Sequence, residues 1–226
     1  MNNNIGILKE SSLHRHLKYR YCGSGKTEIS VGDYVCDGQS DTGELIEVQI
    51  GNFGPFREKI AMLSKKGKIR IIYPIIVHRY IELYDAKGNL IRKRKSSKKG
   101  SAWDLFNDLI HAPEIALNPK SKLELVFLDI VERRKDDGKG SWRRKGVTIE
   151  DRIPIAWHES IIFKKLSDYC LFIPIKEAFF TVKDLETKAR IPRALARKCI
   201  YVLNRIGVIE RSGKQGNAFI YKKSGK

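Results

Sequence analysis

Apolar residues recur along parts of the chain with the period of an α-helix. Leu13, Leu17 and Tyr21 stand four residues apart within residues 7–22, so they form one stripe along a helix. Glu10 and His14 have the same spacing and share a second face of that helix. The segments 55–66 and 101–117 also have helical character. The sequence therefore predicts three helices in its first half.

Two segments of the chain combine β-forming residues with turn-like residues. Residues 27–39 and 44–50 flank Ser-Asp-Thr-Gly at positions 40–43. Residues 81–95 are centred on the turn-like tripeptide Lys87-Gly88-Asn89. Both segments predict β-hairpins.

Uniformly apolar runs predict strands that are covered on both faces. These runs are residues 69–78 and 123–132. A strand, the helix 55–66 and the strand 69–78 in succession imply a parallel crossover, so the expected fold class is α/β, a mixed sheet flanked by helices. The polar stretches 92–101 and 133–146 lack apolar periodicity and are expected to be exposed loops.

The C-terminal segment has the sequence signals of two helices and a hairpin. Thr181 and Asp184 have the spacing of a capping box, and Pro192 opens a longer helix that Gly207 ends. The residues after Gly207 fold back around Gly213–Gly216 as a basic two-stranded hairpin. The longer helix has an inward side of Leu195, Cys199, Val202 and Leu203, and a basic side of Arg193, Arg197, Lys198 and Arg205.

Positive charge then narrows the class of partner. The chain has 226 residues, long enough for two domains, and its 44 Lys and Arg residues against 26 Asp and Glu give a net charge of +18. Nucleic acid is the polyanion that such a surplus fits best, although a basic protein also gains solubility from its charge. No apolar run approaches the roughly 20 residues of a membrane span, so no membrane partner is expected.

The N-terminus and the cysteines bear on the cellular location. Met-Asn-Asn-Asn lacks the pattern of a signal peptide, which predicts a cytoplasmic protein. The four cysteines, Cys22, Cys36, Cys170 and Cys199, form no CxxC pair, so they predict buried thiols rather than a zinc site or disulfides.

The C-terminal segment resembles the winged-helix family over residues 170–226, through the helix ending "NRIGVIER" and the return strand "GNAFIY". In that family the second helix enters the DNA major groove and the wing contacts the flanking backbone. The resemblance implies that double-stranded DNA is bound by Arg193, Arg197, Lys198, Arg205, Lys214 and Gln215. Some winged helices serve protein association instead, and that alternative stays open.

Acidic residues in the first hairpin suggest a catalytic site. Asp37 lies ten residues before Glu47, and Gln49 points to the same side of its strand as Glu47. Glu47 also interrupts an apolar strand, where a carboxylate is costly unless it is paired or bound to a metal. An ordinary polar hairpin is the alternative interpretation.

This arrangement resembles the PD-(D/E)XK nuclease superfamily over residues 7–80, which implies a restriction-endonuclease-like fold. In that family the carboxylates hold Mg²⁺, or Mn²⁺, and the metal and a lysine activate water against a phosphodiester. The resemblance implies that Glu10, Asp37 and Glu47 bind the metal. Cys36 replaces the proline of the motif and Gln49 replaces its lysine, so Gln49 would orient water and Lys59 would supply the charge.

The sequence thus predicts a metal-dependent DNA endonuclease with a nuclease domain at 1–150 and a winged helix at 151–226. Many nucleases of this fold act as homodimers, so a homodimer is a further expectation by analogy. The alternative is a DNA-binding protein or regulator whose nuclease fold has lost its chemistry.

Overall fold

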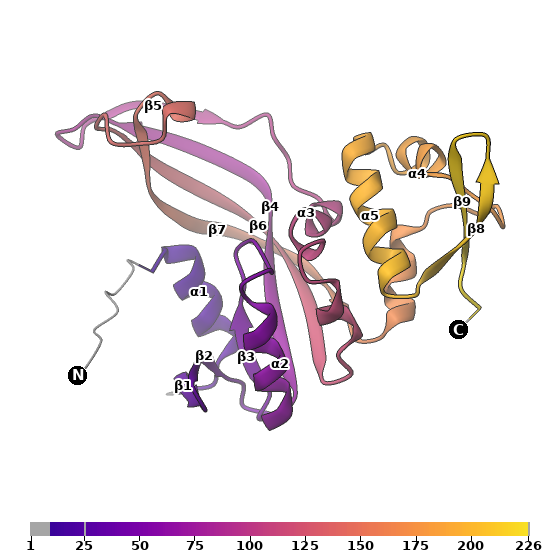
Figure 1. Ribbon diagram of the computed structural model, residues 1–226. Helices are drawn as coiled ribbons and strands as arrows, with labels where there is room; N and C mark the ends of the chain where they lie inside the picture. Colours follow the sequence, from indigo (N-terminus) through magenta and orange to yellow (C-terminus); the bar gives the residue numbers. More distant parts are fainter. Residues whose placement is uncertain (1–9, 25, 226) are drawn as a thin grey trace.

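A mixed β-sheet forms the centre of the molecule (Figure 1). The computed structural model describes residues 10–24 and 26–225. Within them, the sheet has seven strands: six follow the order β1-β2-β3-β4-β6-β7, and the seventh, β5, pairs with the C-terminal end of β4. The α/β class expected from the sequence is confirmed. The strands are β1 (Thr27–Val31), β2 (Tyr34–Gln39), β3 (Leu45–Val48), β4 (Ile69–Tyr84), β5 (Leu90–Lys95), β6 (Ser121–Asp136) and β7 (Val147–Phe163).

The first part of the chain follows the order helix, three strands, helix, strand. Helix α1 (Ser12–Tyr21) precedes the antiparallel strands β1 to β3, and helix α2 (Arg57–Lys66) joins β3 to the parallel strand β4. The predicted crossover is confirmed. The segment 27–39 contains two strands rather than one, because Gly32 adopts a φ of 62° and turns the chain. Residues 7–9 of the expected first helix lie outside the described residues.

Helices cover both faces of this sheet. On one face, Leu13 and Leu17 of α1 pack with Ile46, Ile72 and Val126. On the other face, α2, the short helix α3 (Leu105–Leu109) and the C-terminal helices enclose the larger core. The apolar run of β4 is therefore buried on both sides, as its composition predicts.

The helix expected over residues 101–117 is broken into three short pieces. A 3-10 helix (Ala102–Asp104, η1) leads into α3, and a second 3-10 helix (Pro113–Leu117, η2) follows. Pro113 has no N–H to donate and disfavours helical geometry at the preceding residue, and Ala112 accordingly has a φ of −152°. The expectation of one continuous helix was wrong.

Strands β4 and β6 extend further than the sequence predicts, and β7 was not predicted. The pairing of β6 with β7 runs from Leu123 opposite Phe163 to Asp136 opposite Val147. Residues 92–95 lie in β5 and residues 133–136 in β6, so the loops expected at 92–101 and 133–146 are shorter than predicted. The second loop contains a 3-10 helix (Trp142–Arg144, η3).

The expected domain boundary at 150/151 falls inside β7. Because β7 pairs with β6 along most of its length, the sheet continues to Phe163 and the C-terminal region begins only after it. Strand β7 was not predicted, because residues 147–163 form no apolar run: most are half-buried, and they include Asp151, Pro154 and His158.

The C-terminal region consists of short helices and a hairpin. Thr181 and Asp184 form the predicted capping box, in which the Thr181 N–H donates to Asp184 Oδ2 at 2.7 Å. Backbone hydrogen bonds between Phe180 and Tyr221 attach the C-terminal hairpin to the segment that precedes residue 182. The elements are a 3-10 helix (Leu166–Phe172, η4), α4 (Val182–Ala189), α5 (Arg193–Arg205), β8 (Ile209–Gln215) and β9 (Ala218–Lys223).

The C-terminal region shares its core with the sheet. The ring centroid of Phe172 lies 4.6 Å from that of Phe106 and 5.5 Å from that of Phe163, at the end of β7. Cys199, Val202 and Leu203 of α5 are buried in the same core, as predicted, and Leu195 is partly buried against it. Of the cysteines, Cys170 is exposed, which contradicts the expectation of buried thiols, and Cys22 is half-buried.

Candidate functional site

Asp37 and Glu47 lie side by side on the antiparallel strands β2 and β3. The Val48 N–H donates to Asp37 Oδ2 at 2.7 Å, and the Asp37 N–H donates to Glu47 Oε2 at 3.3 Å. Only 4% of the Glu47 side chain and 17% of the Asp37 side chain are exposed. The structure therefore brings together the two carboxylates that the sequence singled out.

A lysine from α2 reaches this pair. Lys59 Nζ donates to Glu47 Oε1, and the Lys59 side chain is mostly buried. Lys59 belongs to the crossover helix between β3 and β4, so the parallel crossover places its cation beside the end of the hairpin. The position supports the sequence-based choice of Lys59 as the cation of the site.

His14 occupies a place that sequence reasoning missed. Its Nε2 lies 3.3 Å from Asp37 Oδ2, and its Nδ1 lies 2.5 Å from Glu10 Oε1. Lys18 Nζ is 3.0 Å from the same Glu10 oxygen. Glu10 therefore contacts His14 and Lys18, and the imidazole stands between Glu10 and Asp37. The four-residue spacing of Glu10 and His14 was visible in the sequence, but the docking of α1 beside β2 was not.

The charges of the site shift its pKa values in opposite directions. Burial, and then the negative charge of Asp37, raise the pKa of Glu47 to about 7, although Lys59 opposes the shift. Burial also disfavours the charged form of Asp37, but the hydrogen bond and charge of His14 outweigh it and lower the Asp37 pKa. Burial likewise opposes protonation of His14, but Asp37 and Glu10 outweigh it and raise the His14 pKa. Glu47 thus holds a proton more readily than an ordinary carboxylate.

The amide of Gln49 is used by the turn that follows β3. Its Nε2 donates to the carbonyl oxygens of Gly51 and Asn52, at 2.8 Å each. Because the amide nitrogen is used in this way, only the carbonyl oxygen of the side chain remains to accept a hydrogen bond from water. Gln49 therefore has a role in the turn that its position in the motif does not reveal.

The basic residues expected to contact DNA fall into two groups. Arg193, Arg197, Arg205, Lys214 and Gln215 are exposed. Lys198 is half-buried, and its Nζ donates to Asn107 Oδ1 at 2.9 Å. Since Asn107 belongs to α3, this hydrogen bond joins α5 to the sheet region. Lys198 therefore differs from Arg197, whose side chain is exposed to solvent.

A second basic surface lies at the end of the long strands, which we call the basic arm. Every residue of β5 is exposed, and Lys93 pairs with Glu82 at 3.0 Å. Beyond β6, Trp142 is 83% exposed and lies beneath the guanidinium of Arg143, 5.6 Å from its ring centroid. The exposed basic residues of the arm are Arg92, Lys93, Arg94, Lys95, Arg133, Lys139, Arg143, Arg144 and Lys145.

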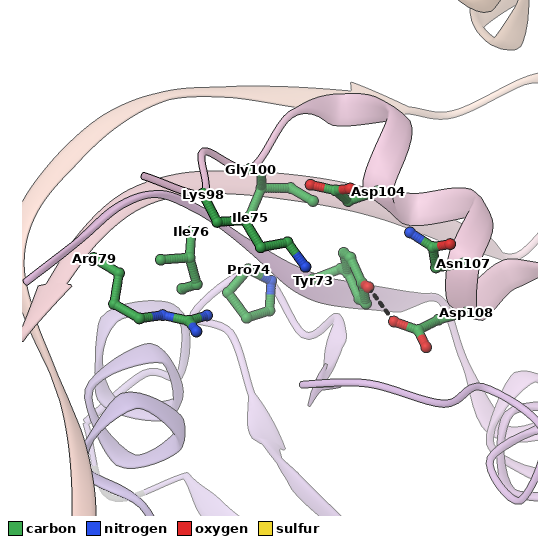
Figure 2. A pocket seen from close by; sticks show the side chains of 10 residues that line it. All are labelled: Tyr73, Pro74, Ile75, Ile76, Arg79, Lys98, Gly100, Asp104, Asn107 and Asp108. Carbon is green, nitrogen blue, oxygen red and sulfur yellow. Dashed lines mark hydrogen bonds between the residues drawn. The ribbon is translucent and has the colours of Figure 1, made fainter. Parts of the chain in front are cut away.

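A pocket beside β4 contains charges of both signs (Figure 2). It lies between the strand and the segment 98–108, and Arg79, Lys98, Asp104 and Asp108 line it. The hydroxyl of Tyr73 donates a hydrogen bond to Asp108, so one of the two carboxylates of the pocket already has a partner. None of the residues predicted from the sequence as catalytic lines this pocket.

Comparison with known proteins places the chain in a family without assigning it an activity. No helix among the described residues is long and apolar enough to cross a membrane. No solved structure matches the chain.

A Treponema pallidum (strain Nichols) protein, described as uncharacterized, is 24% identical over 222 residues, which cover 97% of this chain and 87% of the relative. The family described as "Domain of unknown function (DUF8091)" matches residues 11–164, most of the chain, and the protein belongs to that family.

Proposed function

We propose that this protein is a metal-dependent DNA endonuclease of the PD-(D/E)XK type. The observation that carries the proposal is the convergence of Asp37 and Glu47, with Lys59 reaching Glu47 from the crossover helix. The order of helix, three strands, helix and parallel strand around these residues is the order of that superfamily's core. The family resemblance and the geometry therefore point to the same residues.

The chemistry of the donors fits a magnesium ion. Mg²⁺ prefers oxygen ligands and is commonly held by one or two carboxylates together with water and substrate phosphates. Asp37 and Glu47 supply such oxygens. Burial, and then the charge of Asp37, raise the pKa of Glu47, and a bound divalent cation would stabilise its ionised form. Glu10 is separated from Asp37 by His14, so we assign the metal to Asp37 and Glu47.

The remaining residues have roles in binding and orienting the substrate. When bound, the metal would polarise a phosphodiester and lower the pKa of a water molecule. Lys59 supplies positive charge next to Glu47. A cation there would stabilise the negative charge that develops on a phosphodiester during hydrolysis. His14 Nε2 lies 3.3 Å from Asp37 Oδ2, and its hydrogen bond and charge lower the Asp37 pKa, which favours the ionised carboxylate.

We propose that the C-terminal region binds duplex DNA as a winged helix. Two helices joined by a short turn, a hairpin after them, and a bridge from the hairpin to Phe180 match the family's element order. Arg193 and Arg197 are exposed on the second helix, and Lys214 on the hairpin. The basic arm adds a second surface for phosphates. A homodimer, which would cut both strands, remains part of the proposal.

A non-catalytic DNA-binding protein is the second candidate. The observation that favours it is Gln49, which takes the place of the motif's lysine and whose amide nitrogen bonds to the turn 51–52. Both candidates predict DNA binding, whereas only the first predicts strand scission.

Incubation of supercoiled plasmid with Mg²⁺ or Mn²⁺ separates the two candidates. We expect metal-dependent nicking by the wild type and none by Glu47→Ala, which should bind DNA at least as well because a negative charge has been removed. Glu44→Gln is the matched control, since Glu44 precedes the same strand and pairs with Lys122 at 2.5 Å. Equal nicking by wild type and Glu47→Ala would refute the site. DNA binding without any nicking would establish the second candidate.

A further inference from the structure

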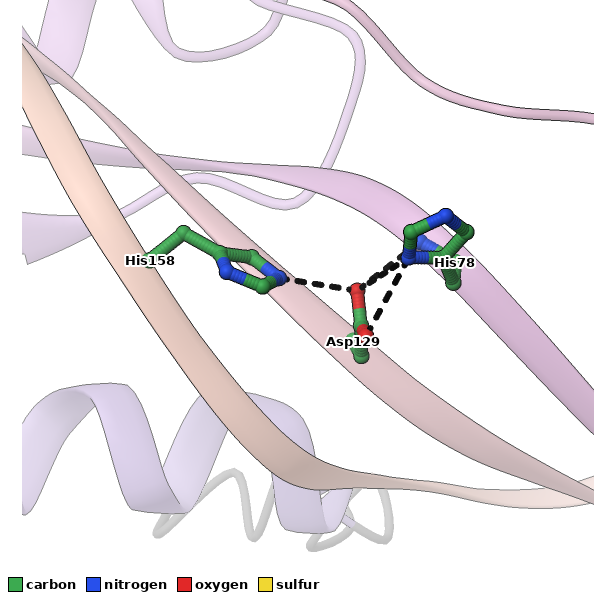
Figure 3. Close-up of side chains that lie close together, drawn as sticks. All are labelled: His78, Asp129 and His158. Carbon is green, nitrogen blue, oxygen red and sulfur yellow. Dashed lines mark hydrogen bonds and ion pairs between the residues drawn. The ribbon is translucent and has the colours of Figure 1, made fainter.

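Two histidines and an aspartate meet on the sheet, on three neighbouring strands (Figure 3). We propose that His78 of β4, Asp129 of β6 and His158 of β7 bind a divalent transition-metal ion, and that the ion is zinc. The proposal is independent of the nuclease function, because the hydrogen bonds of this cluster join its members to one another and not to Asp37 or Glu47.

The distances within the cluster are those of a ligand set. His158 Nε2 lies 3.0 Å from Asp129 Oδ1, and His78 Nδ1 lies 3.1 and 3.2 Å from the two Asp129 oxygens. Ligands about 2.0–2.1 Å from a tetrahedral zinc ion stand roughly 3.3 Å from one another. Among the described residues, these three offer donor atoms that all lie within 4.8 Å of one another. A small outward movement of the rings would admit an ion.

Two irregularities of the sheet assemble the cluster. In β4, Ile76 pairs with Leu128 and His78 with Asp129, so Val77 is an extra residue that turns His78 to the face of Asp129. In β7, Trp157 pairs with Leu128 and Ser160 with Val126, so residues 158 and 159 together oppose Phe127. Bulges commonly re-aim side chains near functional sites. Here, one bulge lies next to His78 and the other contains His158.

The chemistry of the three side chains suits zinc better than magnesium. Imidazole nitrogen is a preferred ligand of zinc and of neighbouring transition metals such as copper and nickel, whereas magnesium is bound by oxygen ligands. The His78 N–H donates to Asp129 Oδ1 at 3.0 Å and thereby orients the carboxylate. The Asp129 side chain is 12% exposed and that of His158 is 42% exposed, so the site is open on one side. Three protein ligands with an open fourth position is the arrangement of catalytic zinc sites.

Zinc titration of the metal-free full-length protein, with any affinity tag removed and a chromophoric chelator as competitor, tests the proposal. We expect one zinc ion per chain, and His158→Ala should weaken binding by more than about tenfold, the lower limit for loss of a supporting residue. His16→Ala is the matched control, because His16 is an exposed histidine on α1 and its Nδ1 bonds to the Ser12 carbonyl. Unchanged binding in His158→Ala, or no binding by the wild type, would overturn the proposal.

Two further variants secure the assignment. His158→Cys with Co²⁺ should produce a thiolate-to-metal absorption band that wild type and His16→Ala lack, and its absence would overturn the proposal even if His158→Ala folded poorly. Glu47→Gln should bind zinc as wild type does. A loss of zinc in Glu47→Gln would place the ion at the Asp37 and Glu47 site, and a simple hydrogen-bonded cluster would then explain His78, Asp129 and His158.

Discussion

The carboxyl of Glu47 is buried next to Asp37, and its ionisation therefore affects the stability of the fold. Its pKa is about 7 in the folded protein, because of burial and then the charge of Asp37, against an ordinary value of 4.5. Between these two pH values the folded state binds the proton that the unfolded state has lost, so stability falls as pH rises from about 4.5 to about 7. Asp37 has the opposite effect at lower pH. Its pKa is lowered below the ordinary value of 3.8, so the stability that it contributes is lost as pH falls below that value.

Glu47→Gln should therefore stabilise the protein above pH 7 in the absence of metal. We expect a rise in Tm on the order of 5 °C at pH 8, since each kcal/mol shifts the Tm of a chain of this size by about 2–4 °C. The difference from wild type should shrink as pH falls toward 4.5 and vanish about one pH unit below that value, where Glu47 is protonated in both states. Thermal unfolding at a series of pH values, with Glu44→Gln as control, measures this. A difference that is independent of pH would contradict the shifted pKa.

Magnesium should reverse the difference in Tm between the wild type and Glu47→Gln at pH 8. If Asp37 and Glu47 bind the ion, Mg²⁺ at pH 8 should raise the Tm of the wild type and leave that of Glu47→Gln nearly unchanged.

Gln49 tests whether the site tolerates the motif's usual lysine. Gln49→Lys should retain or increase cleavage, because an ammonium restores positive charge and can still donate to the carbonyls of Gly51 and Asn52. Gln49→Leu loses both hydrogen bonds and should cost about 1 kcal/mol of stability for each. Plasmid nicking and thermal unfolding of the two variants provide the readouts. Loss of cleavage in a folded Gln49→Lys protein would show that the glutamine acts in another way.

Helix α5 carries two neighbouring cations with different environments. Arg197 is exposed, whereas Lys198 donates to Asn107. Arg197→Ala should make the log–log salt dependence of DNA affinity shallower by about one, because about 0.9 counterion is released per phosphate contact. Lys198→Ala should leave this slope unchanged and instead lower stability by about 1 kcal/mol. Arg193, at the start of the helix, should affect discrimination between DNA sequences by about 1–3 kcal/mol.

Fluorescence anisotropy at several salt concentrations, together with denaturant unfolding, distinguishes these effects. Lys214→Ala on the hairpin should behave as Arg197→Ala does. Equal slopes in wild type, Arg197→Ala and Lys214→Ala would mean that the C-terminal region serves protein association.

The elements that the sequence predicted well are those whose own residues contain the signal. The crossover helix, the apolar strands and the capping box of α4 follow from periodicity, composition and local spacing. Strand β7 does not, because its residues are mostly half-buried and it is held by pairing with β6. The hairpin predicted over residues 81–95 is confirmed, because β5 pairs with the end of β4. Only the assignment of residues 92–95 to an exposed loop was wrong, since lysine and arginine are common on exposed edge strands.

The residues of the candidate site were likewise predicted only where they lie close together in the sequence. Asp37 and Glu47 were found because they belong to one hairpin with a regular register. His14 and Asp37 come from different elements, and their contact depends on how α1 docks. The cluster of His78, Asp129 and His158 spans 80 residues of sequence and depends on two bulges that no local pattern announces.

At the scale of the whole molecule, the shared core predicts that the sheet and the C-terminal region unfold together. Phe172 is 1% exposed and contacts Phe106 and Phe163 as well as Trp103, whose ring centroid is 5.1 Å away. Phe172→Ala should lower the free energy of unfolding by about 3–5 kcal/mol while keeping a single transition. The adjacent Leu171 is 56% exposed, so Leu171→Ala should change stability by no more than about 0.5 kcal/mol.

Coincident transitions by circular dichroism and tryptophan fluorescence would support one cooperative unit, since Trp103 reports on the contact itself. A fragment of residues 151–226 would begin within β7 and expose the surface of α5 that packs on α3. We therefore expect that fragment, and the shorter fragment 164–226, to be largely unfolded in isolation. DNA binding by the C-terminal region is consequently best measured in the full chain. A cooperatively folded 164–226 fragment, or two separate transitions in the intact protein, would show that the region is an independent domain despite the aromatic core it shares with the sheet.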